Sequence, residues 1–229
     1  MSFNVSNEQI ALRIMQNKQW MTETPEGKER AEDCKEGLAM CDYNGDGQTS
    51  AIEMYKDISD TYSFIFEGND KFSARAQEIA LAQGEIYSKY AGDDGILDEY
   101  EYDAALSSGE NVTLLDQYWE MKDAWEAMQG NNEIKGLFRN DINNDKQVGA
   151  IEIYQNKVDL YSEVFKDDSE KLEMAKQIAL TQAEILSKYA GDDGVLSSEE
   201  YANALRSESY GLTMEAYLNL VSSLNSLKA

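Results

Sequence analysis

The chain has 229 residues and is strongly acidic, with 44 Asp and Glu against 20 Lys and Arg and a formal net charge of -24. This charge repels nucleic acid and anionic membrane surfaces, so we expect neither as a partner. The chain has no histidine, which excludes histidine-based catalysis and the commonest zinc ligand. With 42% hydrophobic residues, it is too apolar for a disordered acidic tail, and we expect a globular protein.

The first twenty residues contain no sustained apolar run behind a basic start, so they resemble neither a signal peptide nor a membrane span. Cys34 and Cys41 lie seven residues apart in what we read as one helix. Their Cα atoms would then be about 10.5 Å apart, beyond the roughly 7 Å that a disulfide can bridge. Two unpaired thiols favour a reducing compartment. We therefore expect a cytoplasmic protein without a membrane span, in which both thiols are small buried hydrophobes.

The spacing of the apolar residues predicts an all-α fold. Pro25 is the single proline, and the apolar residues recur at intervals of three and four rather than alternating. Thr24 before Pro25 is a good N-cap and first-turn pair. Further helices are expected to begin at the N-caps Ser6, Thr113 and Thr213. Two stripes in the first half predict core faces, namely Ile52, Tyr55, Ile58, Tyr62, Phe66 and Ala76, Ile79, Ala80, Ile86, Tyr87, Tyr90; the second half has similar stripes that begin at Ile151 and Leu172.

The sequence contains an internal duplication. Residues 42–106 align with residues 141–205 without a gap, and 32 of the 65 positions are identical. We therefore predict two similar domains, residues 1–108 and 109–229, each with a leading helix, and the second with an extra C-terminal helix. The segment 107–111 is the best candidate for the joint between them. Each half carries two acidic loops of different kinds.

The segment DYNGDGQTSAIE at residues 42–53 has oxygen-bearing side chains at positions 1, 3, 5, 9 and 12 and glycine at position 6. A twelve-residue loop wraps Ca²⁺ between two helices with this spacing. The loop resembles an EF-hand, and its alternative is a solvated Asx-rich turn. The resemblance implies that Asp42, Asn44 and Asp46 bind through their side chains and that Gln48 binds through its backbone carbonyl. It also implies that Ser50 holds a bridging water and that Glu53 binds with both carboxylate oxygens.

The third loop, DINNDKQVGAIE at residues 141–152, departs from this pattern at two positions. Lys146 stands where glycine is expected and would adopt a left-handed conformation that costs on the order of 1–2 kcal/mol. Gly149 has no side chain to hold a water at position 9. We expect weaker binding here than in the first loop, or none. The ligands that the resemblance implies are Asp141, Asn143, Asp145, the carbonyl of Gln147, and Glu152.

The second and fourth loops do not fit the twelve-residue form, which would place Tyr90 and Tyr189 at position 1. In an eleven-residue register, AGDDGILDEYE and AGDDGVLSSEE resemble the shortened first hand of the calpain-type penta-EF-hand proteins. Gly95 and Gly194 depart from that family. The alternative is that these loops bind no metal and only pair with their neighbours. The resemblance implies the ligands Ala91, Asp94, Ile96 and Glu101 in one loop and Ala190, Asp193, Val195 and Glu200 in the other, with Asp98 and Ser197 acting through water.

The gap from Glu53 to Ala91 is close to that of sarcoplasmic calcium-binding proteins and implies long helices within each half. Paired hands usually share a short ribbon, here expected through Thr49 with Leu97 and Val148 with Leu196. We expect up to four Ca²⁺ ions, with Mg²⁺ as a competitor. The expected role is an intracellular calcium buffer, and the alternative is a calcium sensor that exposes an apolar groove to a partner helix. An enzyme is not expected, because nucleophile, base and phosphate cradle are all missing.

Overall fold

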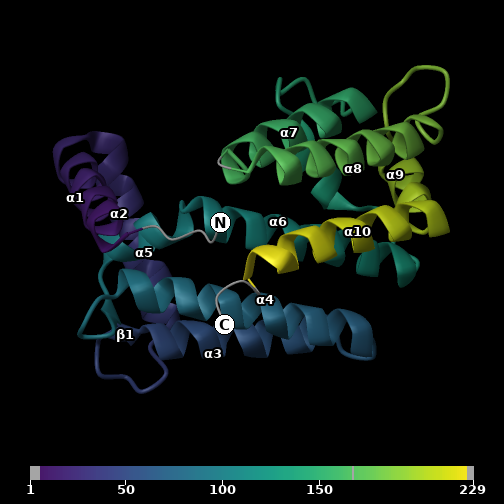
Figure 1. Cartoon of the computed structure of the whole chain (residues 1–229). Coiled ribbons are helices and arrows are strands. Elements are labelled where there is room, and N and C mark those ends of the chain that lie inside the picture. The colour runs from purple at the N-terminus through teal and green to yellow at the C-terminus, as the bar shows by residue number, and fades with distance from the viewer. Residues whose placement is uncertain (1–5, 167, 226–229) are drawn as a thin grey trace. The chain divides into compact units, whose positions relative to one another are not determined.

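The structure, a computed structural model, describes residues 6–166 and 168–225 and is mostly helical (Figure 1). Helices account for 74% and strands for 3%, which confirms the predicted all-α class. The elements of the first half are α1 (Asn7–Glu23), α2 (Pro25–Cys41), β1 (Thr49–Ser50), α3 (Ala51–Ile65), α4 (Asp70–Tyr90), β2 (Ile96–Leu97) and α5 (Glu99–Leu106). They are followed by α6 (Gly109–Met128), the 3-10 helix η1 (Lys135–Asn140), α7 (Ala150–Val164), α8 (Ser169–Ser187), α9 (Ser198–Leu205) and α10 (Glu208–Asn225). Within the described ranges, no helix combines the length and the apolar character needed to cross a membrane.

The chain divides into two compact units, and the division falls inside a helix. The N-terminal unit ends at Leu115 and the C-terminal unit begins at Asp116, whereas α6 runs from Gly109 to Met128. Residues 107–111, predicted as a joint, thus include the first turn of α6. The first seven residues of α6 belong to the N-terminal unit and the remainder to the C-terminal unit.

The N-terminal unit is built on a long hairpin of α3 and α4. Figure 1 shows these helices side by side, with the two acidic loops of the unit at one end of the hairpin. At the other end, the side chain of Asn69 accepts the N–H of Phe72 at 3.1 Å and starts α4. The stripe predicted on α4 is buried throughout, which confirms it as a core face.

The stripe predicted on α3 is correct only in its later part. Tyr62 and Phe66 are buried, but Ile52 is 78% exposed and Met54 takes its place in the core. The same shift occurs at the start of α7, where Ile151 is exposed and Ile153 is buried. In both helices the glutamate between these two residues turns back to the preceding loop, and this sets the rotation of the first turn.

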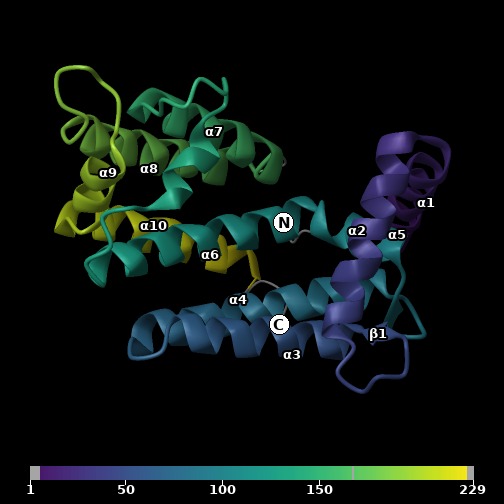
Figure 2. The ribbon, with the colours of Figure 1, turned by 180° about the vertical axis from the view of Figure 1, so that it is seen from behind.

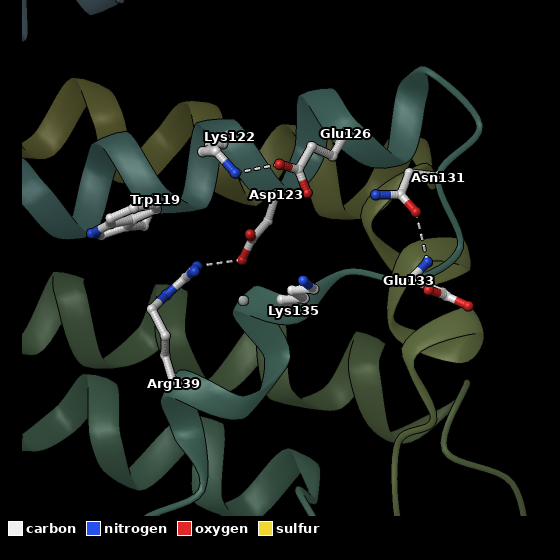
Figure 3. A pocket seen from close by; sticks show the side chains of 9 residues that line it. Trp119, Lys122, Asp123, Glu126, Asn131, Glu133, Lys135 and Arg139 are labelled. Atoms are coloured by element: carbon white, nitrogen blue, oxygen red, sulfur yellow. Dashed lines mark hydrogen bonds and ion pairs between the residues drawn. The ribbon is translucent and has the colours of Figure 1, made fainter. Parts of the chain in front are cut away.

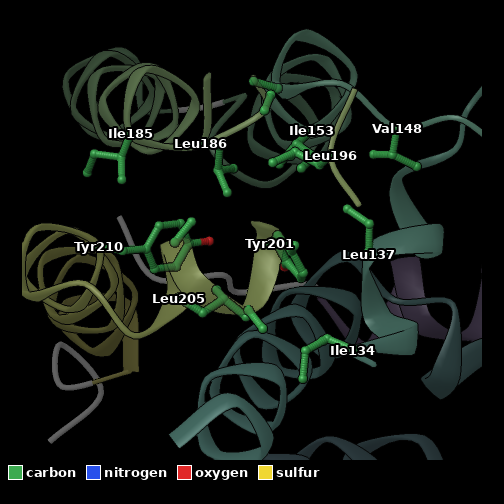
Figure 4. Close-up of a cluster of buried hydrophobic side chains, with 14 of the residues drawn as sticks. Ile134, Leu137, Val148, Ile153, Ile185, Leu186, Leu196, Tyr201, Leu205 and Tyr210 are labelled. Carbon is green, nitrogen blue, oxygen red and sulfur yellow. The ribbon is translucent and has the colours of Figure 1, made fainter. Parts of the chain in front are cut away.

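The C-terminal unit repeats the hairpin with α7 and α8, and α10 lies along α8 (Figure 2). Its core brings side chains from α6, η1, α7, α8, α9 and α10 together. Figure 4 shows Tyr201 and Tyr210 among the aliphatic side chains of this cluster. The residues labelled there are Ile134, Leu137, Val148, Ile153, Ile185, Leu186, Leu196, Tyr201, Leu205 and Tyr210.

Two of the four predicted N-caps are confirmed. The hydroxyl of Ser6 accepts the N–H of Gln9, and that of Thr24 accepts the N–H of Gly27 ahead of Pro25 at the first helical position. The predictions at Thr113 and Thr213 are wrong, because both residues lie inside their helices and donate to backbone carbonyls one turn earlier.

Serines further upstream start these two helices. Ser108 Oγ accepts the N–H of Asn111 at 3.1 Å, and Ser207 Oγ accepts the N–H of Tyr210 at 3.2 Å. These serines are 99 residues apart, so α6 and α10 begin at equivalent positions of the duplication. Serine and threonine are both good N-caps. In each of these two helices the serine comes first in the chain, and the helix begins there.

The segment before the third acidic loop differs from its counterpart before the first. We predicted a helix on each side of every loop, and α2 precedes the first loop with 17 residues. The third loop is instead preceded by η1, a 3-10 helix of six residues without a side-chain cap. Gly130 lies two residues after the last residue of α6 and has a φ of 87°. Within η1, Gly136 leaves room for the carboxylate of Asp123, which lies where a Cβ would stand.

The two cysteines are free and buried, as predicted, and both lie on α2. Burial raises the pKa of each thiol to about 11. Because the thiolate is the reactive form, Cys34 and Cys41 are inert at neutral pH and act as core residues.

Candidate metal centres

The first loop is ordered by its own acidic side chains. Asp42 accepts the N–H of Gly45 at 2.8 Å with one oxygen and the N–H of Gly47 at 2.9 Å with the other. Asn44 Oδ1 accepts the N–H of Asp46 at 2.8 Å. Gly47 has a φ of 85°, the left-handed turn expected of this position. Asp42, Asn44 and Asp46, which are three of the predicted ligands, therefore lie around this turn, where the ion is expected to bind.

Asp46 and Gln48 continue the same pattern, because Asp46 Oδ1 accepts the N–H of Gln48 at 2.9 Å. An ionised carboxylate has about four acceptor sites on its two oxygens. A single backbone bond to Asp46 therefore leaves acceptor capacity for another donor or for a cation. The backbone N–H groups are neutral donors, so they hold the loop in place and the carboxylates keep their negative charge.

Glu53, the last residue of the first loop, reaches back over the loop. Its Oε1 accepts the N–H of Asn44 at 3.3 Å, nine residues earlier in the chain. Its Oε2 accepts the N–H and the hydroxyl of Ser50 at 2.9 and 2.8 Å. The N–H of Ser50 is the main cause that holds the pKa of Glu53 below its usual value. The carboxylate thus joins the start of α3 to the first turn of the loop.

The third loop has the same internal bonds with a more strained backbone. Asp141 accepts the N–H groups of Asp145 and Lys146 at 3.2 and 2.9 Å, and Asn143 Oδ1 accepts that of Asp145 at 2.8 Å. Lys146 has a φ of 65°, which confirms the predicted left-handed conformation, and Asn144 has a φ of 60°. The side chain of Asp145 accepts the N–H of Gln147 at 2.8 Å.

Glu152 closes the third loop and carries an unusual atom. Its Oε2 accepts the N–H of Gly149 at 3.1 Å. Its Oε1 is buried and has no hydrogen-bond partner among the described residues. A buried oxygen without a partner is costly, and a carboxylate oxygen is a favoured ligand of a hard cation. The oxygen atoms of this loop are therefore of the kind that binds a divalent cation.

The second and fourth loops are alike in geometry. Asp94 Oδ1 accepts the N–H of Ile96 at 3.0 Å, and Asp193 Oδ1 accepts the N–H of Val195 at 3.1 Å. Ala91 and Ala190 are predicted to act through their carbonyls, and both are buried: Ala91 is the C-cap of α4, and Ala190 lies three residues beyond the end of α8. All four glycines of these loops have positive φ values between 64° and 71°, so the glycines that depart from the family pattern serve as turn residues here.

Capping boxes at the ends of the loops were missed in the sequence. In a capping box, the N-cap side chain binds the backbone of the third helical residue, whose own side chain binds the backbone of the N-cap. Ser50 with Glu53, Asp98 with Glu101 and Ser197 with Glu200 form such boxes. The residues predicted to hold a bridging water thus start the helices that follow. A serine or aspartate three residues before glutamate is the signal that identifies them.

The second loop differs from the first in the electrostatics of its glutamate. Burial is the largest cause that raises the pKa of Glu101. The hydrogen bond from the N–H of Asp98 lowers this pKa, whereas the negative charges of Asp98 and Asp94 raise it. Repulsion by the neighbouring carboxylates thus adds to the larger effect of burial on this pKa. A cation among them would relieve this repulsion.

The loops of each unit are joined by a short ribbon in the predicted register. Thr49 pairs with Leu97 and Ser50 with Ile96 in an antiparallel β1–β2 pair. In the C-terminal unit, Gly149 and Val195 form a β-bridge, and the N–H of Leu196 donates to the carbonyl of Val148 at 2.8 Å. Both predicted pairings are confirmed, so each loop shares backbone hydrogen bonds with its neighbour.

The acidic side chains of the first and third loops accept backbone N–H groups of their own turns. Across the described residues, no three His, Cys, Asp or Glu side chains are grouped so as to hold a metal ion. Comparisons with family models, with curated proteins and with solved structures found no match for this chain.

Proposed function

We propose that this chain binds Ca²⁺ at its acidic loops, which act as two pairs of EF-hand sites, and that it serves as an intracellular calcium buffer without enzymatic activity. The observation that supports this most is the position of Glu53. It closes the first loop onto the N–H of Asn44, while Asp42 and Asp46 lie around the intervening turn. A bidentate glutamate at the end of such a loop is the ligand that calcium uses.

Calcium suits these loops better than magnesium does. Ca²⁺ accepts six to eight oxygen ligands in flexible geometry, whereas Mg²⁺ requires a near-ideal octahedron and retains several waters. The proposed ligands mix carboxylates, an amide and backbone carbonyls and end in a glutamate with two oxygens. We therefore propose up to four calcium ions per chain, with Mg²⁺ as a weaker competitor.

A helix outside the loops already covers the hairpin of the C-terminal unit, and this supports a buffer over a sensor. Tyr210 and Tyr217 of α10 are buried, and their hydroxyls donate to Glu120 and Asp116 at 3.2 and 2.7 Å. In the N-terminal unit, Asn111 of α6 is buried and accepts from Gln83 of α4 at 3.0 Å. Part of the apolar surface that a sensor would offer is thus occupied within the chain.

A sensor remains the second candidate because of Phe64, which is 79% exposed on α3. A sensor would expose further apolar surface on binding calcium and would bind a partner helix with it. The two candidates differ in what calcium does to the surface, so one measurement separates them.

The experiment starts from protein that has been stripped with a chelator and dialysed. Calcium is titrated by calorimetry, and bound calcium is counted by equilibrium dialysis, with magnesium titrated in parallel. We expect saturable binding of calcium that magnesium competes for weakly. Absence of calcium uptake at millimolar supply would overturn the proposal. A hydrophobic dye present in a second titration distinguishes the roles: an unchanged signal supports the buffer, and a large increase supports the sensor.

A further inference from the structure

A hollow of about 410 Å³ opens in the C-terminal unit, and none of its lining residues belongs to the acidic loops (Figure 3). It lies between α6, the segment 131–134 and η1. Its volume is within the range of small-molecule sites. Nine residues line it, namely Trp119, Lys122, Asp123, Glu126, Asn131, Glu133, Lys135, Gly136 and Arg139.

The walls of this hollow are held by specific contacts. Arg206, the C-cap residue of α9, fixes the segment 131–134, because its guanidinium donates to the carbonyl of Asn131 at 2.9 Å and to the side chain of Asn132 at 2.6 Å. On the other side, the carboxylate of Asp123 fills the place where a Cβ on Gly136 would lie. The short η1 therefore packs close to α6, and the hollow is a built feature of the fold.

Trp119 supplies an aromatic wall. The guanidinium carbon of Arg139 lies 5.0 Å from the centre of its ring, and Lys122 Nζ lies 5.7 Å from it. Such cations are attracted to the face of the indole ring. The side chain of Trp119 is still 36% exposed, so part of this apolar surface is open to a ligand.

The charges around the hollow are balanced, in contrast to the net charge of -24 of the chain. Two of the three cations are already paired, Arg139 with Asp123 and Lys122 with Glu126. Lys135 and Glu133 have no ion pair among the described residues. Figure 3 shows Lys135 between Arg139 and Glu133, with Trp119 at the far side from Glu133. The hollow thus offers one unpaired cation and one unpaired anion beside an aromatic face.

We infer that this hollow binds a free amino acid with an aromatic side chain. The carboxylate of the amino acid pairs with Lys135, its ammonium pairs with Glu133, and its ring packs against Trp119. Charge-assisted hydrogen bonds fix both ends of the backbone, and ring stacking adds apolar contact. A ligand with one charge alone would leave either Lys135 or Glu133 unpaired, so the site favours a zwitterion.

The probe for this inference is L-phenylalanine, titrated into the full chain in the presence of a chelator so that the outcome does not depend on calcium. Binding is measured by calorimetry and by the shift of the Gly136 amide resonance in ¹⁵N spectra. Phenylpropionate lacks the ammonium, and phenethylamine lacks the carboxylate. We expect one saturable site for phenylalanine and binding at least tenfold weaker for either analogue.

Three variants locate the site. Lys135→Met and Glu133→Gln should each weaken phenylalanine binding at least fivefold, whereas Lys166→Met, at an exposed lysine outside the hollow, should leave it unchanged. Circular dichroism confirms that each variant is folded. Absence of a Gly136 shift at 10 mM phenylalanine, equal binding of phenethylamine, or binding unaffected by both hollow variants would each overturn the inference.

Discussion

Glu120 and Lys157 form an ion pair in the interior of the C-terminal unit, with Lys157 Nζ 3.3 Å from Glu120 Oε2. Their side chains are only 4% and 9% exposed. The other oxygen of Glu120 accepts from Gln182 at 2.6 Å and from Tyr210 at 3.2 Å. Burial alone would lower the pKa of Lys157, but the charge of Glu120 together with those of nearby acidic groups raises it above its ordinary value. One carboxylate thereby connects α6 with α7, α8 and α10.

Lys157→Met should destabilise the C-terminal unit strongly. The substitution keeps the length of the side chain but leaves the carboxylate of Glu120 buried without its cation, at a cost of about 3–5 kcal/mol. The double variant Glu120→Gln with Lys157→Met should recover most of this loss, since both groups are then neutral. Urea unfolding of both variants measures the free energy of unfolding, with Lys166→Met as the surface control. Equal stability of the single variant and the control would contradict this role.

Glu53→Gln should remove one calcium ion from the bound count. Glutamine can still accept the hydrogen bonds from Ser50, so the start of α3 is retained, but the second charged oxygen of the proposed bidentate ligand is lost. Equilibrium dialysis gives the number of ions bound per chain. Glu67→Gln, at an exposed glutamate outside the loops, is the matched control. An unchanged count for Glu53→Gln would exclude the first loop as a calcium site.

Lys146→Gly should tighten calcium binding at the third loop. Glycine adopts the observed φ of 65° without the penalty of about 1–2 kcal/mol that a side chain carries, and the change removes a positive charge from the loop. Calorimetry should show a higher affinity for one class of site. Asn144→Gly is the control and should have a smaller effect, because asparagine tolerates this conformation better than lysine does. Weaker binding in Lys146→Gly would overturn this account.

Ser50→Ala should destabilise α3 in the absence of metal. The hydroxyl of Ser50 accepts the N–H of Glu53 at 3.2 Å and donates to its carboxylate at 2.8 Å. Loss of such an N-cap costs about 1 kcal/mol. Unfolding in chelator measures the change, and Ser88→Ala, at an exposed serine within α4, provides the control. A loss in Ser50→Ala no greater than in the control would show that the cap contributes nothing.

Asp123 should give the C-terminal unit a distinct pH dependence. Burial raises its pKa from 3.8 to about 6, although the neighbouring Arg139 lowers it. Because the folded pKa lies above the unfolded one, protonation favours the folded state: this contribution is complete below about pH 4 and is lost as the pH rises through about 6. The loss amounts to about 2–3 kcal/mol. Asp123→Asn should lack it, so the difference in unfolding free energy between the two proteins should change over this range. A constant difference from pH 4 to pH 7 would refute the raised pKa.

Local patterns were sufficient to predict the helical class and the pairing of the loops. The stripe on α4 was correct because a helix of 21 residues repeats its period often enough to define one buried face. At Ile52 the same reasoning failed, because the bonds of Glu53 to the preceding loop set the rotation of the first turn. Thr113 and Thr213 were misread as caps because Ser108 and Ser207 precede them with the same chemistry.

Distant contacts could not be predicted from the sequence. The short η1 depends on Asp123, thirteen residues before Gly136, and no periodicity in either segment signals that approach. The acidic side chains that the spacing singles out in the first loop accept backbone N–H groups of the turn, and their role as metal ligands stays a prediction. This spacing could not distinguish a metal ligand from a helix cap, since Ser50 and Glu53 satisfy both patterns. The burial of Glu152 Oε1 is apparent only in the three-dimensional structure.

The position of α6 has a practical consequence for dissecting the molecule. A cut at residue 108 would deprive Gln83 of its partner Asn111, and a cut at residue 115 would leave a terminal helix of seven residues, too short to be stable on its own. A fragment of the second half that begins at Asp116 would in turn lack the upstream turns of the helix that carries Glu120. Two separately expressed halves must therefore both include the whole of α6, so their sequences overlap.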